Sequence, residues 1–311
     1  MKSQAIILSG ANSYEIGKFN DPQNLGTELE LVASPIAPLD LQIIAGDFPL
    51  IGGYPLITGV SGVGKSAQGK NFFVFSQGVG GGFQTPGVHR QFFCYPDSII
   101  FPLHPSVDPI AASAVMISHL TAYSIIHDVF CAKAGDSILI LGANGSLGKS
   151  CIAIGQKLGL EVFAASRAGA DINGATGIAN DAIGTEFLVK HGKECDFVIN
   201  PLGGPLSAAA QSVSAPHSTH VLVGVSAHPA LELIGPLMIG KAQKFVGFNL
   251  MTVPLSRIGE MVEMTCDDLL NDVIPNHGIE VEAITRYSIA DGRLAIKDAQ
   301  QNNSRVILTS T

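Results

Sequence analysis

The stretch from Ser137 to Gly169, SILILGANGSLGKSCIAIGQKLGLEVFAASRAG, constrains the fold of this chain more than any other feature. An apolar run ends in a glycine-rich corner, a helical pattern follows, and a second apolar run comes directly after it. Strand, helix and strand in this order and at this spacing are typical of the βαβ unit of a parallel sheet. The sequence therefore predicts an α/β fold built around this corner.

The same alternation extends from about residue 110 to residue 254. Apolar runs separated by helical patterns predict the parallel strands SILIL, EVFAAS, DFVIN, HVLVG and KFVGF. The intervening helical patterns include GKSCIAIGQKLG, residues 148–159, and PLSAAAQSVSA, residues 205–215. This rhythm predicts a doubly wound parallel sheet with helices on both faces.

The two ends of the chain, residues 1–109 and 255–311, lack this regular alternation of strand and helix patterns. The first range contains short strand-like runs broken by glycine and proline, such as ELELVAS, NFFVFSQ, QFFCYP and SIIFPL. The second range contains helical patterns at 256–272 and 292–301 and strand patterns at 282–289 and 305–310. We therefore expect a β-rich domain made from both ends, with residues 110–254 inserted into it as the parallel-sheet domain.

Charge and apolar content exclude several kinds of partner. With 18 Lys and Arg against 26 Asp and Glu, the net charge of −8 does not suit a nucleic acid or an anionic membrane surface. Five cysteines lie without a disulfide or metal-ligand spacing, so we expect free thiols. The longest apolar segment, residues 109–130, contains His, Ser and Thr and is too polar for a membrane span, which predicts a buried helix. The N-terminus predicts a first strand in place of a signal peptide, and a cytoplasmic protein.

The glycine-rich corner, GANGSLG, is a candidate dinucleotide site. Its three glycines, Gly142, Gly145 and Gly148, follow a predicted strand and open a predicted helix, which is the context that such a pattern requires. The first glycine permits a tight turn, the second allows close approach of a diphosphate, and the third allows the helix to pack on the strand. The N–H groups at the helix start supply the anion-binding field.

The end of the second strand indicates which nucleotide is preferred. A site that prefers NAD usually has Asp or Glu there to accept a hydrogen bond from the ribose 2′-hydroxyl. This chain has Ser166 and Arg167 instead. A guanidinium suits a 2′-phosphate through its charge and its paired N–H donors. The sequence therefore predicts NADPH as the cofactor.

Several ordered motifs give the chain a family resemblance over nearly its whole length. They are ASPIAPLDLQIIAGDFP with Asp40, PLITGVSGVG, HLTAYSII, GDSILILGANGSLG, DFVINPLGG, HVLVGVSAHPA and KFVGFNL. In this order and spacing they resemble the zinc-independent medium-chain dehydrogenase/reductase family, of the quinone oxidoreductase and 2-enoyl-thioester reductase type. The resemblance implies a Rossmann domain inserted in a chaperonin-10-like catalytic domain, NADPH in the cleft between them, a small-molecule substrate, and a homodimer formed through the edge of the Rossmann sheet.

The resemblance also implies which residues bind the cofactor. Gly145, Ser146, Leu147 and Gly148 would meet the diphosphate, next to Gly142 and Asn144, and Ser166 and Arg167 would meet the 2′-phosphate. On the nicotinamide side it implies Thr121, Gly224, Val225, Phe248 and Asn249.

Departures from the family pattern bear on the chemistry. Zinc-using relatives carry a His-Glu pair near ITGVSGVG and a cysteine in the APLD segment, where this chain has Val60, Ser61 and Pro38. We therefore expect no metal. The usual Asn of the family is Ala37 here, and the proton-donating tyrosine of the enoyl reductases falls at Phe48, which has no hydroxyl.

Two side chains are candidates for the missing proton donor. Tyr54 lies a few residues beyond Phe48, and His119 lies next to Thr121. A loop aromatic for Tyr54 and a helix residue bound by backbone for His119 remain alternatives. His217 and His220 lie three residues apart before a strand and are interpreted as surface residues.

Two functions follow from these features. The first is an NADPH-dependent reductase of quinones, conjugated enones or 2-enoyl thioesters, which transfers hydride without a metal. The alternative is a non-enzymatic NADPH-binding or sensor protein with a degenerate active site, because Ala37 and Phe48 remove two groups of the family's site. A zinc alcohol dehydrogenase is disfavoured by the absence of its ligands.

Overall fold

The computed structural model describes residues 2–20, 26–224, 228–273, 284–302 and 305–310, and they form two compact units. The first unit holds Met1–Ile117, Pro254–Asp272 and Ile279–Thr311, and the second holds Ser118–Val253 and Val273–Gly278. The chain passes from the first unit to the second between residues 117 and 118, and returns between residues 253 and 254. The sequence patterns predict these two boundaries at 109/110 and 254/255.

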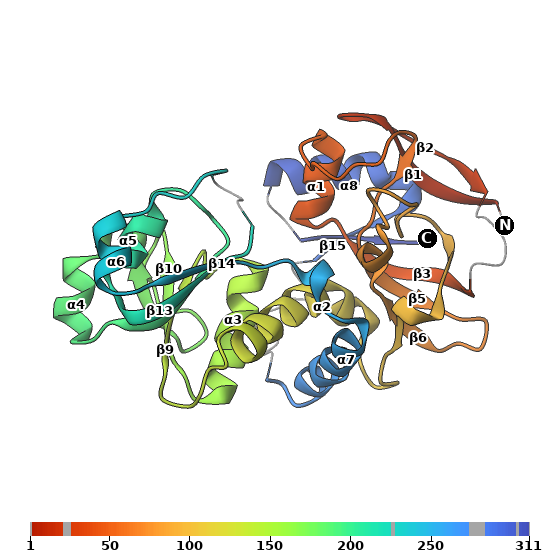
Figure 1. Ribbon diagram of the computed structural model, residues 1–311. Coiled ribbons are helices and arrows are strands. Elements are labelled where there is room, and N and C mark those ends of the chain that lie inside the picture. Colours follow the sequence, from red (N-terminus) through yellow and green to blue (C-terminus); the bar gives the residue numbers. More distant parts are fainter. Residues whose placement is uncertain (1, 21–25, 225–227, 274–283, 303–304, 311) are drawn as a thin grey trace. The chain divides into compact units, whose positions relative to one another are not determined.

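A parallel sheet forms the centre of the second unit (Figure 1). Its strands, in chain order, are β9 (Ser137–Leu141), β10 (Glu161–Ser166), β11 (Thr176–Ala179), β12 (Cys195–Asn200), β13 (Ser214–Leu222) and β14 (Lys244–Gly247). Their spatial order is β11-β10-β9-β12-β13-β14, and every neighbouring pair is parallel. This order is that of the Rossmann fold, and it confirms the doubly wound sheet predicted from the sequence.

Helices cover both faces of this sheet because its strands are apolar on both sides. Besides the C-terminal part of α2 (Pro109–Tyr123), the described helices of this unit are α3 (Ser146–Leu158), α4 (Thr185–His191), α5 (Leu206–Ser212) and α6 (Gly235–Gly240). Leu139, Phe163 and Val198 form a buried core with Phe187 of α4 and Ala210 of α5. On the other face α3 packs on β9 and β10.

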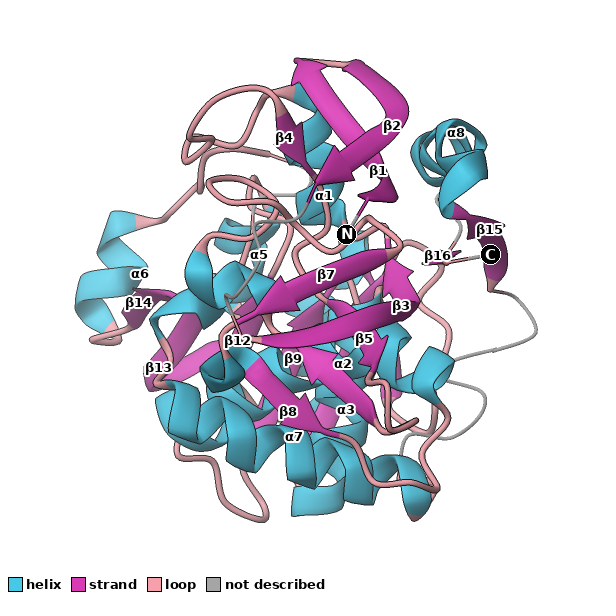
Figure 2. Cartoon of the chain, turned by 90° about the vertical axis from the view of Figure 1, so that its right-hand side faces the viewer, coloured by secondary structure: helices cyan, strands magenta, loops and turns pink. Residues whose placement is uncertain are grey.

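The first unit is β-rich, and Figure 2 shows β7, β3 and β5 side by side within it. A seven-stranded sheet has the order β15-β16-β3-β5-β6-β8, with β7 paired to β3 off that path, and a smaller sheet has the order β2-β1-β4. The strands are β1 (Lys2–Gly10), β2 (Ser13–Asn20), β3 (Thr27–Pro35), β4 (Leu56–Ile57), β5 (Gly62–Lys65), β6 (Asn71–Val74), β7 (Phe92–Tyr95), β8 (Ile100–Pro102), β15 (Thr285–Ser288) and β16 (Val306–Thr309). The helices are α1 (Pro38–Ala45), α7 (Leu255–Leu270) and α8 (Gly292–Asn302).

Helix α2 (Pro109–Tyr123) continues without a break into a π-helical segment, Ser124–Val129. Contrary to our expectation that this stretch is too polar, Pro109–Val129 is long and apolar enough to cross a membrane by length and composition, with a mean hydropathy of 1.4. However, 67% of its most apolar window is buried inside the protein, as expected for a core helix.

One predicted helix ends earlier than its sequence pattern. The pattern runs to residue 215, but α5 ends at Ser212 and β13 begins at Ser214. Two polar side chains near this end bind backbone groups: Ser214 Oγ donates to Ala210 O, and the Gln211 amide bonds both to the N–H and to the C=O of Ile234. Such bonds offer the backbone an alternative to further helical turns.

Candidate functional site

The order of the parallel sheet creates a topological switch point between β9 and β12. From β9 the chain moves to β10 on one side, and from β12 it moves to β13 on the other. In open α/β sheets, ligands bind outside the carboxyl ends of the strands at such a point. The glycine-rich corner follows the carboxyl end of β9 and therefore lies at this point.

The local backbone structure requires glycine at two of the three positions, Gly142 and Gly148. Gly142 has φ of 66°, in the left-handed region that favours glycine. A Cβ on Gly148 would lie 2.6 Å from the backbone of Ala143, so no other residue fits there without a shift of the backbone. The interpretation of Gly148 as a packing residue is consistent with this contact.

Gly145 is less crowded than Gly148, with a single tight contact among the described residues. It precedes α3 in extended conformation, and a Cβ there would have Gly142 O, at 3.3 Å, as its nearest neighbour. The side of Gly145 that a larger residue would fill is thus open to a ligand. Such an open cradle fits a diphosphate, which needs close backbone approach.

The first turn of α3 leaves three backbone N–H groups without an acceptor among the described residues, those of Ser146, Leu147 and Gly148. The first helical bond of the corner is donated by Lys149 N to Gly145 O. Gly145 supplies no side-chain cap. Three free donors at the positive end of a helix dipole are the donor set that an anion requires, so the residues present fit a nucleotide diphosphate.

Ser166 and Arg167 lie at the carboxyl end of β10, next to the corner. Ser166 is buried, and its Oγ accepts a hydrogen bond from Gly169 N at 3.1 Å, so the side chain shapes the turn. Arg167 is exposed, and its guanidinium makes no hydrogen bond or ion pair within the described part of the chain. Its charge is therefore available to a phosphate group.

The predicted nicotinamide-side residues follow the last two strands. Gly224 comes after β13 with φ of 111°, and Phe248 N donates to Leu222 O at 2.9 Å, just beyond β14. Asn249 Oδ1 accepts from Met251 N at 3.0 Å and caps the next turn. Gly224, Phe248 and Asn249 thus follow the carboxyl ends of β13 and β14, at the same end of the parallel strands as the glycine corner. Thr121 is buried in α2, and Val225 lies outside the described residues.

Sequence reasoning missed the role of Asn200, the last residue of β12. Its side-chain oxygen accepts from Leu202 N and Gly203 N, each at 2.9 Å, and its nitrogen donates to Ser207 Oγ at 2.9 Å. Leu202 in turn lies beside Gly142, where an added Cβ would meet Leu202 Cδ2 at 3.2 Å. The motif DFVINPLGG marked this turn, but the bonds of its asparagine depend on tertiary structure.

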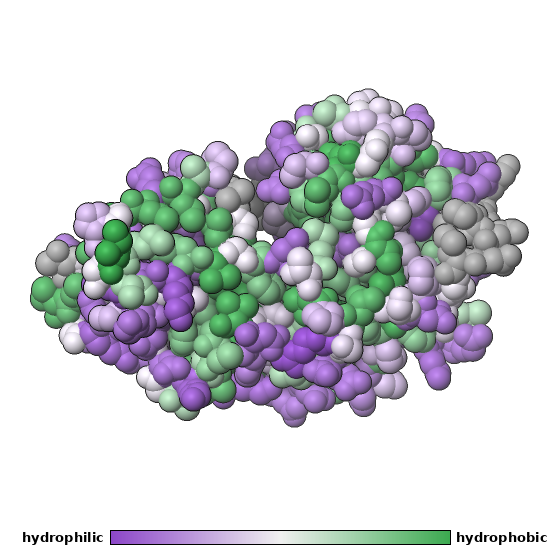
Figure 3. All heavy atoms as spheres, viewed as in Figure 1, coloured by the Kyte–Doolittle hydropathy of each residue, from purple (hydrophilic) through white to green (hydrophobic). Residues whose placement is uncertain are grey.

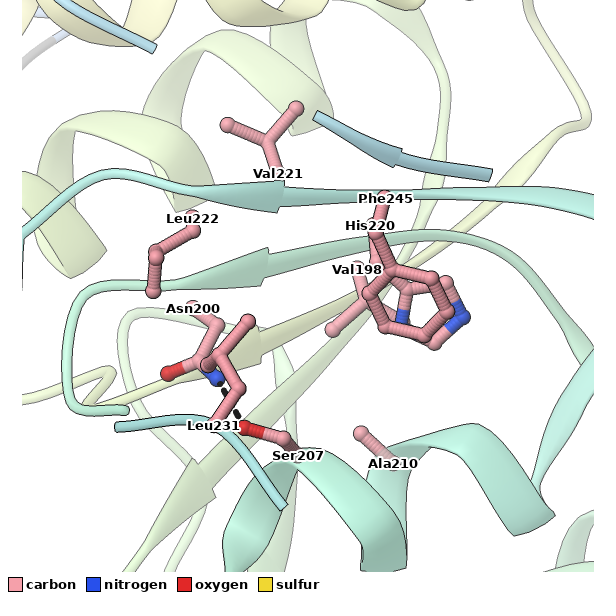
Figure 4. Close-up of a pocket in the computed structure, with 9 residues that line it drawn as sticks. All are labelled: Val198, Asn200, Ser207, Ala210, His220, Val221, Leu222, Leu231 and Phe245. Atoms are coloured by element: carbon pink, nitrogen blue, oxygen red, sulfur yellow. Dashed lines mark hydrogen bonds between the residues drawn. The ribbon is translucent and has the colours of Figure 1, made fainter. Parts of the chain in front are cut away.

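A small pocket lies under α5 on the same face as Asn200 (Figure 4). Figure 4 shows the rings of His220 and Phe245 against each other, and their centroids are 4.5 Å apart. The interpretation of His220 as a surface residue is wrong: it is 4% exposed, because residues 214–222 form a strand in the interior of the sheet. Burial lowers the pKa of His220 to about 4, so the ring is neutral at pH 7.

Of the two candidate proton donors, Tyr54 is exposed and His119 is fully buried. Tyr54 lies in the first unit, on the loop between α1 and β4, and His119 lies in the second unit, on α2. The His119 ring meets Tyr123 edge-on, with centroids 5.5 Å apart. This packing favours the alternative of a core histidine for His119.

Asp40 joins the segments around Pro38 and Val60 of the first unit, where the sequence resemblance implies zinc ligands in other proteins. Its carboxylate is buried and accepts from Ala37 N at 2.9 Å and from Gly59 N and Val60 N at 3.1 Å each. Burial raises the pKa of Asp40, against the nearby His89 and these three N–H groups, which lower it. Among the described residues, no three His, Cys, Asp or Glu side chains gather as metal ligands would.

Comparisons with known proteins agree with this geometry, although no family model matches the chain. A mitochondrial enoyl-[acyl-carrier-protein] reductase of Caenorhabditis elegans is 29% identical over 136 residues, 43% of this chain and 40% of that enzyme. A highly-reducing polyketide synthase of Aureobasidium melanogenum is 27% identical over 239 residues, 71% of this chain and 10% of the synthase. The chain therefore spans less than half the length of either relative.

Solved structures match over nearly the full chain. An alcohol dehydrogenase superfamily protein from Novosphingobium aromaticivorans has a TM-score of 0.85 at 22% identity, covering 99% of this chain and 100% of its own. A Pseudomonas syringae quinone oxidoreductase has 0.81 at 18%, covering 99% of both chains. A Salmonella enterica oxidoreductase in complex with NADP has 0.76 at 17%, covering 100% of both. This chain thus has the two-domain fold of the medium-chain dehydrogenases/reductases, and is similar in sequence to an enoyl reductase and to polyketide synthases.

Proposed function

We propose that this protein is an NADPH-dependent oxidoreductase that reduces quinones, conjugated enones or 2-enoyl thioesters without a metal. The observation that carries the proposal is the set of three N–H groups at the start of α3 that have no acceptor among the described residues, at the switch point of the sheet. The named activities of the quinone oxidoreductase and enoyl reductase relatives support the reaction type.

The nucleotide would be held by groups of the second unit. The N–H groups of Ser146, Leu147 and Gly148 would bind the diphosphate, and the exposed guanidinium of Arg167 would bind the ribose 2′-phosphate. The neighbouring structure that holds NADP supports this choice. When bound, the nicotinamide supplies the hydride.

Reduction also needs a proton, for which we propose the Tyr54 hydroxyl. Tyr54 is 40% exposed, so its phenol can exchange protons with water. Where the acceptor is a quinone, solvent itself can supply the proton. Reduction of a quinone would therefore not require the tyrosine that the enoyl reductases have at the position of Phe48.

Titration of the folded protein with NADPH and NADH, followed by an acceptor screen, tests the proposal. We expect tighter binding of NADPH and its oxidation by 1,2-naphthoquinone or crotonyl thioesters. Tight NADPH binding with no turnover, unrestored by Phe48→Tyr, would support the alternative of a non-enzymatic binding protein. Absence of heat with either nucleotide would refute both.

We also propose that the protein acts in the cytoplasm as a homodimer, with a small molecule as substrate and no nucleic-acid or membrane partner. The net charge of −8 supports the absence of a nucleic-acid or membrane partner. The strand β14 ends the parallel sheet, and exposed apolar side chains lie near it at Leu233, Ile234, Met238, Ile239 and Val246. Figure 3 shows apolar atoms at the surface over α6. An open sheet edge beside an apolar surface suits pairing with a second copy.

A further inference from the structure

The turn that follows β12, residues 200–204 (NPLGG), carries a leucine that lies against the glycine corner. A Cβ added to Gly142 would meet the Cδ2, Cγ and Cδ1 atoms of Leu202 at 3.2, 3.4 and 3.5 Å. The Leu202 side chain is partly buried and packs on the core of the sheet that contains Leu139 and Val198. Leu202 is therefore held between the corner and the sheet.

The backbone of Leu202 is bonded to a second segment. We call residues 223, 224 and 228–232 the nicotinamide-side segment, because the family resemblance implies that Gly224 lies on that side of the nucleotide. The carbonyl oxygen of Leu202 accepts a hydrogen bond from His228 N at 3.0 Å, and the Leu202 N–H donates to Asn200 Oδ1 at 2.9 Å. One residue thus contacts both the glycine corner and the nicotinamide-side segment.

Two glycines leave no space between the turn and this segment. Gly203 and Gly204 have φ of 73° and 67°, in the left-handed region that favours glycine. A Cβ on Gly203 would lie 2.3 Å from His228 O, and a Cβ on Gly204 would lie 2.5 Å from His228 Cδ2. Groups packed this closely are little compressible and transmit a displacement. A movement of the turn therefore moves His228.

Further hydrogen bonds hold the segment to the same turn on both sides of Gly224. Val223 N donates to Asn200 O at 3.1 Å, and Gly204 N donates to Ala230 O at 2.7 Å. The backbone on which the nicotinamide half of a nucleotide would lie is thus positioned by the turn after β12.

The corner has its own connection to Leu202. Gly145 N donates to Gly142 O at 3.0 Å, so the residue that forms the open cradle is bonded to the glycine that Leu202 contacts. Contacts therefore run without a gap from Gly145 through Gly142 and Leu202 to His228. They connect the place of the diphosphate with the place of the nicotinamide, and all of them lie within the second unit.

From these contacts we propose that Leu202 is a positioning residue that couples the two halves of the nucleotide site. A diphosphate at the corner fixes Gly142, and through Leu202 it fixes the nicotinamide-side segment before the nicotinamide binds there. Such coupling is reciprocal, so a bound nicotinamide also strengthens binding at the corner by the same factor. The inference rests on the proposed function, since it concerns the nucleotide named there.

A double-mutant cycle in the nucleotide-free protein tests the contact itself. Gly142→Ala places a Cβ 3.2 Å from Leu202 Cδ2. We expect amide hydrogen exchange in peptides spanning 201–206 and 228–234 to become roughly 3–10-fold faster. Leu202→Ala removes the side chain that this Cβ meets but keeps the backbone bond to His228. In that background Gly142→Ala should leave the exchange of both peptides unchanged.

Gly159→Ala is the matched control for the cycle. Gly159 also has a left-handed φ, 79°, and an added Cβ there would meet Ala134 Cβ at 3.4 Å. This variant has similar backbone strain without a contact to Leu202, so exchange in 228–234 should not change. Equal acceleration by Gly142→Ala in both backgrounds would show that the sheet carries the effect and would overturn the proposal. No acceleration by Gly142→Ala would also overturn it.

A binding measurement tests the same coupling with the nucleotide, and it decides the matter if Gly142→Ala does not fold. NADPH and 2′-phospho-ADP-ribose differ in the nicotinamide, so the ratio of their dissociation constants measures what that ring adds. In Leu202→Ala we expect the NADPH advantage to fall roughly fivefold or more, while the affinity for 2′-phospho-ADP-ribose changes less than about twofold.

Two further variants control this measurement. Leu188→Ala removes the same side chain from the same core and should leave the ratio unchanged. Leu202→Met keeps the side-chain volume and should keep the wild-type ratio. An unchanged ratio in Leu202→Ala, or an equal fall in Leu188→Ala, contradicts the inference. If neither ligand binds the wild type, the proposed function fails, and the exchange cycle still decides whether Leu202 couples the corner to the segment.

Discussion

The side-chain nitrogen of Asn200 donates to Ser207 Oγ at 2.9 Å and thereby ties the end of β12 to the first turn of α5. The oxygen of the same amide holds the turn through Leu202 and Gly203. Because Leu202 lies beside Gly142, this asparagine fixes one wall of the glycine corner. The shape of the proposed nucleotide site therefore depends on a buried amide that does not itself need to touch the nucleotide.

Alanine substitutions at two glycines of the corner should affect different properties, one the unfolding free energy and the other the affinity for NADPH. Gly148→Ala forces a Cβ to 2.6 Å from the Ala143 backbone, so we expect a loss of about 1–3 kcal/mol in unfolding free energy. Gly145→Ala brings its Cβ to 3.3 Å from Gly142 O, a milder contact, so its melting temperature should fall less than that of Gly148→Ala while NADPH affinity falls roughly tenfold, ~1.4 kcal/mol. Thermal melts and calorimetry measure both, and a Gly145→Ala protein with unchanged affinity would exclude this corner as the diphosphate site.

Arg167 should set the choice of nucleotide. In Arg167→Asp the charge-assisted bonds to the 2′-phosphate are replaced by repulsion, so NADPH affinity should fall by roughly 10–100-fold, about 1.5–3 kcal/mol. NADH affinity should fall little. Arg286→Asp, an exposed arginine of the first unit, makes the same change of charge and should leave the ratio of the two dissociation constants unaltered. A ratio that moves equally in both variants would show a general field effect.

Tyr54 should carry the proton for enone acceptors. Tyr54→Phe keeps the ring and removes the hydroxyl, so kcat with an enone should fall by roughly 10²-fold, with little change for a quinone that solvent can protonate. His119→Gln is the comparison, and as a core substitution it should lower the melting temperature. Steady-state kinetics on both acceptors measure this, and equal loss on both would argue against a proton-transfer role for Tyr54.

Acid should weaken the parallel-sheet unit through His220. Its pKa is lowered to about 4 in the folded protein, whereas an unfolded histidine titrates near 6.5. The unfolded state therefore binds the proton first, and stability is lost as pH falls from about 6.5 towards 4, by roughly 3 kcal/mol at most. Melting temperatures of the wild type and His220→Leu, measured from pH 7.5 to 4.5, should diverge in the variant's favour at low pH. Parallel curves would show that His220 is not the titrating group.

The open edge at β14 should be a dimer interface. Ile239 is 84% exposed on α6, and Ile239→Lys would place a charge in the proposed contact, so the protein should sediment as a monomer. Val189→Lys, at a similarly exposed position on α4, should sediment like the wild type. A wild-type protein that is monomeric at micromolar concentration would end this proposal.

The sequence predicted the strands of the parallel sheet well because each is an uninterrupted apolar run, as burial on both faces requires. The sequence prediction started β13 at residue 220, too late, because the first part of this strand, SAPHST, is polar and lacks an apolar strand pattern. His220 comes directly after this polar part and was therefore predicted to be at the surface. The bonds of Asp40 join segments far apart in sequence, and those of Asn200 depend on local turn geometry. Composition and spacing do not report such bonds.

The pairing of β16 with β3 has a consequence for synthesis on the ribosome. Leu308 lies opposite Ser34, so β16 completes a sheet whose earlier strand left the exit tunnel some 270 residues before. The intervening Rossmann unit has all its strands by Gly247 and can mature while elongation continues. Until β16 is made, β3 of the β-rich unit has an open edge, and an open strand edge in a nascent chain favours aggregation and the binding of chaperones.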